Sequence, residues 1–246
     1  MYLFTFLYCI DSISPKMSNK EPRYNMEIKL PSNYSFFDEY PYCQYQPFNG
    51  SCDATYAQGV LLSVSHRFCR LTEEQLTMSL QYLVSCDPLN LGCRDGNTQS
   101  LIYFLEQEGI TDTKCHPWEN KFEFNTSFCA KCKDGSDPFH YRLNPLSYKI
   151  MKDITKIQED IYLKGPVACK IVDLSGADED IIRGYDEKMI ATQTAEIIGW
   201  EEKEELVWIV YHEKWGIKRV RAGFNDALIE SEVYSMIPEE LVISMK

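Results

Sequence analysis

The sequence predicts an α+β protein of two lobes, a helical and cysteine-rich lobe followed by a lobe built from β-strands. Three observations predict this class. Apolar residues recur with helical spacing in the first half, eight cysteines lie between residues 43 and 132, and β-branched and aromatic runs follow Pro166. Two lobes with separate cores leave a cleft between them, where a ligand site is expected.

Two helices are predicted at the start of the helical lobe. The first covers residues 55–68 and places four apolar side chains on one face, namely Val60, Leu61, Val64 and Phe68. Thr72 and Gln75 have the spacing of a capping box, in which each side chain satisfies a backbone N–H of the first helical turn. The box predicts that a second helix begins at residue 72, with an inner face of Leu76, Leu80, Leu83 and Val84.

Two further helices have clear stop signals. One is predicted over residues 98–107 and ends before Gly109, because glycine readily leaves the helical conformation. The other is marked by Ile154, Ile157 and Ile161 and ends before Pro166, whose ring cannot continue a helix. Four strands are then predicted over residues 167–172, 194–200, 205–211 and 217–222, the middle two joined by an acidic hairpin loop over residues 201–205.

The composition and net charge argue against a nucleic acid partner. The 246 residues are 44% hydrophobic and 25% charged, an ordinary globular balance, and the formal net charge is −12. Such a charge repels phosphate backbones, so no nucleic acid partner is expected.

The apolar run over residues 2–10 is too short to span a membrane. It resembles the apolar part of a secretory signal, so residues 1–14 are predicted to be a signal peptide and residues 15–29 a linker or residual pro-segment.

The cysteines support a secretory compartment. Cys9 lies inside the predicted signal peptide, and of the nine others eight form an even set that four disulfides can use, with Cys169 left over. A zinc site is the alternative, because Cys129 and Cys132 have ligand-like spacing, but no second such pair accompanies them and disulfides are favoured. Sequons at Asn33, Asn49 and Asn125 fit the same compartment. The protein is therefore expected to be a secreted or lysosome-like glycoprotein without a metal ion or cofactor.

Several segments resemble segments of the papain type of cysteine peptidase, in its cathepsin B-like branch, and they occur in the same order along the chain. GSCDATYA (50–57) is similar to the family's C-G-[SA]-C-[WY] segment, and SVSHRFC (63–69) to the end of its central helix. VSCDPLNLGCRDG (84–96), YLKGPV (162–167) and ALIESEVYSMIP (227–238) are similar to further family segments in the same order. The resemblance implies that residues 30–246 form a papain-like fold. Its helical lobe would lie mainly in 44–135 and its antiparallel, barrel-like sheet lobe mainly in 136–226.

The same resemblance implies how the cysteines pair. Carried over to this chain, the family's disulfides would join Cys43 to Cys69, Cys52 to Cys93, Cys86 to Cys129, and Cys115 to Cys132. Cys52 would then be a structural half-cystine and not a reactive thiol.

The resemblance also shows replacements at the catalytic positions. Thr55 stands where the nucleophilic cysteine is expected, Thr194 where the family has its histidine base, and His212 where it has the orienting asparagine. Asn49 matches the oxyanion-hole glutamine but is one methylene shorter. The resemblance thus implies the peptidase fold without its Cys/His/Asn set.

At other positions of the cleft, this chain matches the family's residues only in part. Gly96 matches the second glycine of the loop that binds the substrate backbone, whereas Asp95 replaces the first. Glu230 matches the acid that, in the cathepsin B group, binds a basic substrate side chain in the S2 pocket. The alternative interpretation is that Glu230 is an ordinary surface carboxylate. Between Cys115 and Cys129 the chain is too short for the loop that closes one end of the groove in cathepsin B.

Three functional hypotheses follow. The first is an inactive, monomeric homologue that binds a peptide or protein ligand in the cleft. The second is a peptide hydrolase that uses Thr55 as nucleophile and His212 as base. The third is a decaying gene copy with only a structural fate.

Overall fold

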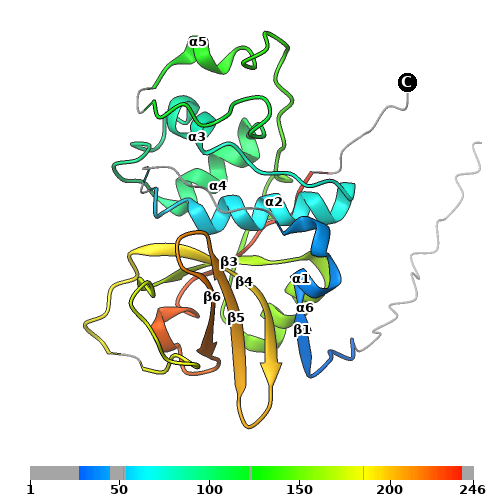
Figure 1. The fold of residues 1–246 in the computed structure, drawn as a ribbon, viewed down its shortest axis with the longest axis vertical. Helices are drawn as coiled ribbons and strands as arrows, with labels where there is room; N and C mark the ends of the chain where they lie inside the picture. Colours follow the sequence, from blue (N-terminus) through cyan, green and yellow to red (C-terminus); the bar gives the residue numbers. More distant parts are fainter. Residues whose placement is uncertain (1–27, 45–51, 53, 122–123, 185, 240–246) are drawn as a thin grey trace, which may run out of the picture.

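The computed structural model describes residues 28–44, 52, 54–121, 124–184 and 186–239. The predicted signal peptide, Asn49 and all but the last two residues of the predicted linker lie outside these ranges. Figure 1 shows a helical lobe at one end, a sheet lobe at the other, and one long helix, α2, running between them. The helices are α1 (Phe36–Glu39), α2 (Gln58–Thr72), α3 (Leu80–Cys86), α4 (Thr98–Gln107), α5 (Thr126–Cys129) and α6 (Ile154–Lys164).

A seven-stranded sheet dominates the second lobe. Its order is β2-β7-β3-β4-β5-β6, and β1 pairs with β4 outside this path; every strand pairing is antiparallel. The strands are β1 (Asn33–Ser35), β2 (Lys149–Met151), β3 (Val167–Ile171), β4 (Gln193–Glu202), β5 (Leu206–His212), β6 (Gly216–Arg221) and β7 (Val233–Ser235). The four strands predicted from sequence are confirmed, and the acidic loop joins β4 to β5 as a hairpin. The predicted α+β class is also confirmed.

Helix α2 belongs to both hydrophobic cores. Its predicted apolar face, which includes Val60 and Phe68, packs in the core of the helical lobe, while Leu62 packs in the core of the sheet lobe. All residues from 59 to 69 are buried, including the polar ones. Ser63 donates a hydrogen bond to the Pro166 carbonyl oxygen at 2.7 Å, and His66 Nδ1 lies 2.9 Å from the Glu196 carboxylate of β4. The polar face of α2 therefore attaches the two lobes to each other.

The prediction that a helix begins at Thr72 is wrong. Thr72 is the last residue of α2, its hydroxyl donates to the Phe68 carbonyl oxygen at 3.0 Å, and Glu73 follows in the left-handed conformation with φ 58°. The next helix, α3, begins after Ser79, whose hydroxyl accepts the Tyr82 N–H at 2.9 Å. The Thr72 hydroxyl closes the last turn of one helix instead of opening another, because α2 extends beyond residue 68. The predicted third and fourth helices are found as α4 and α6.

Four disulfides cross-link the described chain, and they join the pairs that the family resemblance implies. These are Cys43–Cys69, Cys52–Cys93, Cys86–Cys129 and Cys115–Cys132. Each bridge typically stabilises a fold by about 2–4 kcal/mol, mainly by restricting the unfolded chain. Among the described residues, Cys169 of β3 is the free cysteine, and burial raises the pKa of its thiol.

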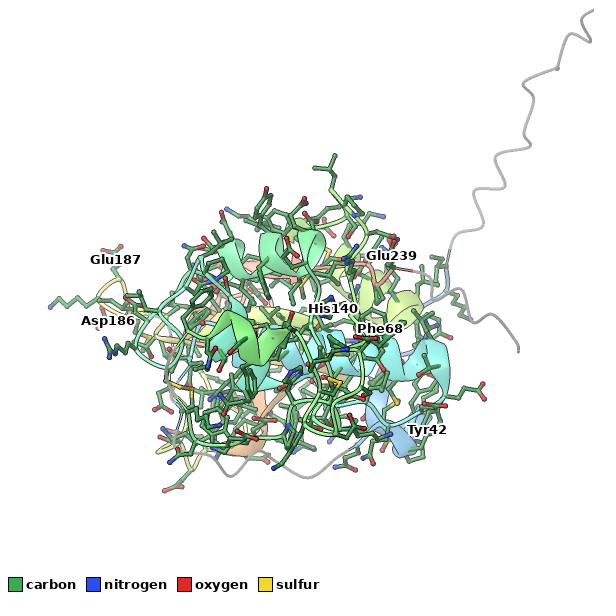
Figure 2. The ribbon with its side chains drawn as sticks, turned by 90° about the horizontal axis from the view of Figure 1, so that it is seen from above. Tyr42, Phe68, His140, Asp186, Glu187 and Glu239 are labelled. Carbon is green, nitrogen blue, oxygen red and sulfur yellow. A yellow bond between two sulfur atoms is a disulfide. The ribbon has the colours of Figure 1, made fainter. Side chains whose placement is uncertain are left out.

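The long connection from β3 to β4 carries acidic groups outward. Figure 2 shows Asp186 and Glu187 projecting away from the body of the molecule, whereas Phe68 lies within it. Both acidic residues are exposed. No helix among the described residues combines the length and the apolar character that crossing a membrane requires. Of the three sequons, Asn33 and Asn125 are exposed, and Asn49 lies outside the described residues.

Candidate functional site

A polar groove lies where the two lobes meet at the start of α2. It has a volume of about 210 Å³. The helical lobe contributes Thr55, Tyr56 and residues 95–98, and the sheet lobe contributes Lys170 and residues 191–194. Four of the predicted site residues therefore lie together in this groove: Thr55, Asp95, Gly96 and Thr194. The predicted residues His212 and Glu230 do not line it.

Thr194 connects the sheet to the beginning of α2. Its hydroxyl donates to the Thr55 carbonyl oxygen at 2.9 Å and accepts the Gly59 N–H at 3.0 Å, and its backbone N–H donates to the same Thr55 carbonyl at 2.7 Å. The first N–H groups of a helix need partners from outside the helix. Thr194 is buried and serves as that partner, so its hydroxyl proton is already used within the fold.

Removing this hydroxyl tests its structural role. We expect Thr194→Val to lower the free energy of unfolding by about 1–3 kcal/mol, because the buried Gly59 N–H loses its partner while the side-chain volume is nearly unchanged. Guanidinium unfolding of the oxidised protein measures the change. Thr192→Val, at an exposed position two residues earlier, is the matched control and should unfold like the wild type. Equal stabilities of the two variants would contradict the structural role of the Thr194 hydroxyl.

His212 lies at the end of β5 and is fully buried. Its Nδ1 accepts the Lys214 backbone N–H at 3.1 Å, and its ring stacks on Trp215 at a centroid distance of 4.9 Å. An imidazole nitrogen that accepts a hydrogen bond carries no proton of its own. This contact therefore assigns the neutral tautomer with the proton on Nε2, and the Nδ1 lone pair is occupied by the backbone.

Gly96 is held against the ring of Tyr56. A Cβ atom at Gly96 would lie 2.5 Å from that ring, so the position accepts only glycine without rearrangement. Burial, with Asp87 and Asp95 adding to it, raises the pKa of Tyr56, so the phenol stays protonated. Asp95 is exposed, and its carboxylate accepts the Gly96 N–H at 2.7 Å. The amide that the resemblance assigns to substrate binding thus has a partner within the chain.

Glu230 is engaged away from the groove. Its carboxylate accepts the Trp208 indole N–H at 2.8 Å and the backbone N–H groups of Gly223 and Asn225 at 2.6 and 2.9 Å. Three such bonds hold the loop that follows β6, and they leave the side chain little capacity to receive a ligand.

Sequence reasoning missed one charged residue that lines the groove, Lys170, and its ion-pair partner, Glu232. The Nζ of Lys170 lies 2.9 Å from the Glu232 carboxylate. The sequence feature that could have identified Lys170 is its position as a lysine inside the otherwise apolar strand segment VACKIV. A charged side chain in a buried strand points to a partner or a ligand.

Comparisons with known proteins agree with this architecture. A model of the papain family cysteine proteases matches residues 42–244. The chain is 27% identical to cathepsin B-like CP1 of Giardia intestinalis over 223 residues, which cover 84% of this chain and 73% of the relative. It is 22% identical to cathepsin B-like protease 1 of Arabidopsis thaliana, over 78% of this chain and 57% of that relative.

Solved structures show the same fold. Procathepsin B S9 from Trypanosoma congolense is 20% identical with a TM-score of 0.73, covering 87% of this chain and 80% of that one. The proform of the ragweed pollen cysteine protease Amb a 11 is 20% identical with a TM-score of 0.71, covering 89% and 70% of the two chains. The papain-like two-lobe fold and the cathepsin B-like resemblance are thereby confirmed.

Proposed function

Because this chain belongs to the papain family of cysteine proteases, in its cathepsin B-like branch, we propose that it does not hydrolyse peptides and instead binds a peptide or protein segment in its groove. The observation that carries the proposal is the bonding of Thr194. At the position matched to the catalytic histidine, a hydroxyl donates to Thr55 and accepts from Gly59, and a hydroxyl cannot take the proton that a base must remove.

The chemistry of the nucleophile supports the same conclusion. A papain-type cysteine reacts as a thiolate, because a neighbouring imidazolium lowers its pKa from roughly 8.5 to about 3–4. The hydroxyl of Thr55 is a far weaker acid and needs a base beside it to attack a carbonyl. Loss of one essential member of such a catalytic set costs about 10⁶-fold in kcat in a well-studied serine protease. With Thr55 and Thr194 at these positions, we expect no measurable peptidase activity.

A hydrolase built on Thr55 and His212 is the second candidate. It would need His212 to accept a proton, directly or through water. The Nδ1 lone pair of His212 already accepts the Lys214 N–H, and the ring lies against Trp215. This contact favours a structural role for His212 over a role as base.

The cross-links support a proposal about the compartment. The described chain has four disulfides. Disulfides form and persist in oxidising compartments and are rare in the cytosol. We therefore assign the protein to a secreted or lysosome-like compartment, and we expect it to act as a monomer with the groove open to ligands.

The test restores the family's chemistry. The variant Thr55→Cys/Thr194→His/His212→Asn should react with a thiol-directed epoxide about 100-fold faster at pH 6 than the single variant Thr55→Cys. The reason is that an imidazolium makes the thiolate available at that pH, whereas an ordinary thiol is almost fully protonated. Each protein is produced without residues 1–14, the predicted signal peptide that contains Cys9. The wild type should then show neither labelling nor turnover of fluorogenic peptides, because Cys169, the free cysteine among the described residues, is buried.

Circular dichroism and thermal melting check that each variant is folded. Turnover by the wild-type protein that disappears in Thr55→Ala would establish the hydrolase instead. Equal labelling of the folded triple and single variants would show that residues 55, 194 and 212 do not form a papain-type site.

A further inference from the structure

Lys170 of β3 lies between Thr194 of β4 and Glu232, the residue immediately before β7. In the register of β3 and β4, Lys170 is directly opposite Thr194, so their side chains share one face of the sheet. On the other side of Lys170, its backbone N–H donates to the Glu232 carbonyl oxygen at 3.0 Å, which continues the pairing of β3 with β7. A row from Glu232 through Lys170 to Thr194 therefore leads to Thr55 in the groove.

The charges in this row neutralise each other. Lys170 Nζ lies 2.9 Å from Glu232, with 31% and 33% of the two side chains exposed. The Tyr234 hydroxyl donates a second hydrogen bond to the same carboxylate. Burial alone would raise the pKa of Glu232, but the bonds from Tyr234 and Lys170 outweigh it and hold the pKa below its ordinary value. Glu232 is thus ionised and already paired within the chain.

We propose that Lys170 determines the specificity of the groove: its ammonium group occupies the place beside Glu232 that a ligand's basic side chain would take. The groove then excludes peptides with arginine or lysine at this point and accepts a neutral polar side chain. This inference rests on the proposed function, because it names the ligand class of the same groove.

The physical reason is repulsion between like charges at a partly desolvated site. A ligand's guanidinium must either lie next to the Lys170 ammonium or displace it from Glu232, and both cost free energy. An ammonium group has three donors, so a ligand's amide oxygen can accept a hydrogen bond while the ion pair stays intact. An acidic ligand side chain is opposed by Glu232 and by Asp95, which lines the groove from the helical lobe. Neutral amide side chains fit this arrangement best.

The experiment compares two pools of fluorescein-labelled decapeptides by fluorescence anisotropy. The pools are randomised except for a fixed central residue, which is glutamine in one and arginine in the other. The wild type should bind the glutamine pool about tenfold more tightly, a difference of about 1.4 kcal/mol. Lys170→Met should reverse this preference, because Glu232 is then left to attract the arginine. Lys170→Met/Glu232→Gln should bind both pools alike.

Lys156→Met is the matched control. It makes the same change of charge at an exposed ion pair on α6, where Lys156 Nζ lies 2.6 Å from Glu159. This variant should keep the wild-type preference. The same shift in Lys156→Met as in Lys170→Met, or an unchanged preference in Lys170→Met, would overturn the role of Lys170 while leaving peptide binding established. If neither pool binds to any variant, the proposed function itself fails, and this inference fails with it.

Discussion

Replacing Arg67 with methionine is expected to lower the free energy of unfolding by about 3–5 kcal/mol, because it removes the buried charge partner of the Asp160 carboxylate and leaves the partly exposed Lys164 as its remaining ion pair. Arg67 lies on the sheet-facing side of α2 and is fully buried. Its guanidinium donates to Asp160 at 2.6 Å, to the carbonyl oxygens of Pro166 and Gly165 at 2.7 and 3.0 Å, and to the carbonyl oxygen of Met236. One side chain thus holds α2, α6 and the segment after β7 together.

Acid sensitivity gives a second measurement on the same variant. Burial alone would raise the pKa of Asp160, but Arg67, Lys164 and Ser235 outweigh it and hold the pKa below its ordinary value. A carboxylate with a depressed pKa contributes stability that is present above its unfolded pKa, about 4, and is lost as the pH falls through the folded pKa. Without Arg67 the pKa of Asp160 rises toward its unfolded value, so Arg67→Met, although less stable at neutral pH, should lose less further stability than the wild type as the pH falls below about 4.

Arg70→Met is the control for both measurements. Arg70 lies one turn further along α2, is only half-buried, and donates to the Tyr40 hydroxyl at 3.1 Å. Such a partly exposed contact contributes at most about 1 kcal/mol. Guanidinium and pH titrations of the oxidised proteins should therefore separate the two variants clearly. If they unfold alike, the buried network does not hold the lobes together.

The second large effect is expected for Gly59→Ala. A Cβ atom at Gly59 would lie 2.3 Å from the carbonyl oxygen of Ala195 and 2.6 Å from its backbone nitrogen. Neither atom belongs to a flexible side chain, so α2 must move away from β4 and lose the hydrogen bond from Gly59 to Thr194. Overpacking of this kind costs about 3 kcal/mol, which exceeds the roughly 1 kcal/mol that alanine gains over glycine in a helix.

Gly176→Ala is the control for this steric argument. A Cβ atom at Gly176 would meet no atom within 4 Å. The control should therefore melt at or slightly above the wild-type temperature, because alanine restricts the unfolded chain. Thermal unfolding followed by circular dichroism compares the three proteins. A Gly59→Ala variant as stable as the control would show that α2 and β4 are not in close backbone contact.

Long elements were predictable from sequence, and short ones were not. The helix over residues 98–107 and the hairpin of β4 and β5 carry enough periodic residues to be recognised one by one. The strands β1, β2 and β7 have three residues each, and they form because β1 pairs with the longer β4, β7 with the longer β3, and β2 with β7. The capping-box prediction at Thr72 failed for a related reason, since a local motif does not show how far the preceding helix extends.

The candidate site divides in the same way. Sequence reasoning named Thr55, Thr194, Asp95 and Gly96, which the fold brings into one groove from both lobes. It also named Glu230, which instead accepts hydrogen bonds from Trp208 and two backbone amides. Which acid stands beside the groove depends on strand register, and a shift of two residues along the chain leads to Glu232.

The sequence by itself determined the order of the main elements, because that order follows from residue identity and local spacing. The resemblance of its segments to the papain family, also a property of the chain alone, implied the family, the pairing of the cysteines, and the hydroxyl residues that match the catalytic positions. The tertiary structure alone decided which polar groups are satisfied internally. The bonds of Thr194, the network of Arg67 and the pair of Lys170 with Glu232 join residues far apart in the chain. Their partners are set by the packing of α2 on the sheet and by the register of its strands, because burial requires each polar group to find a partner wherever the fold places one.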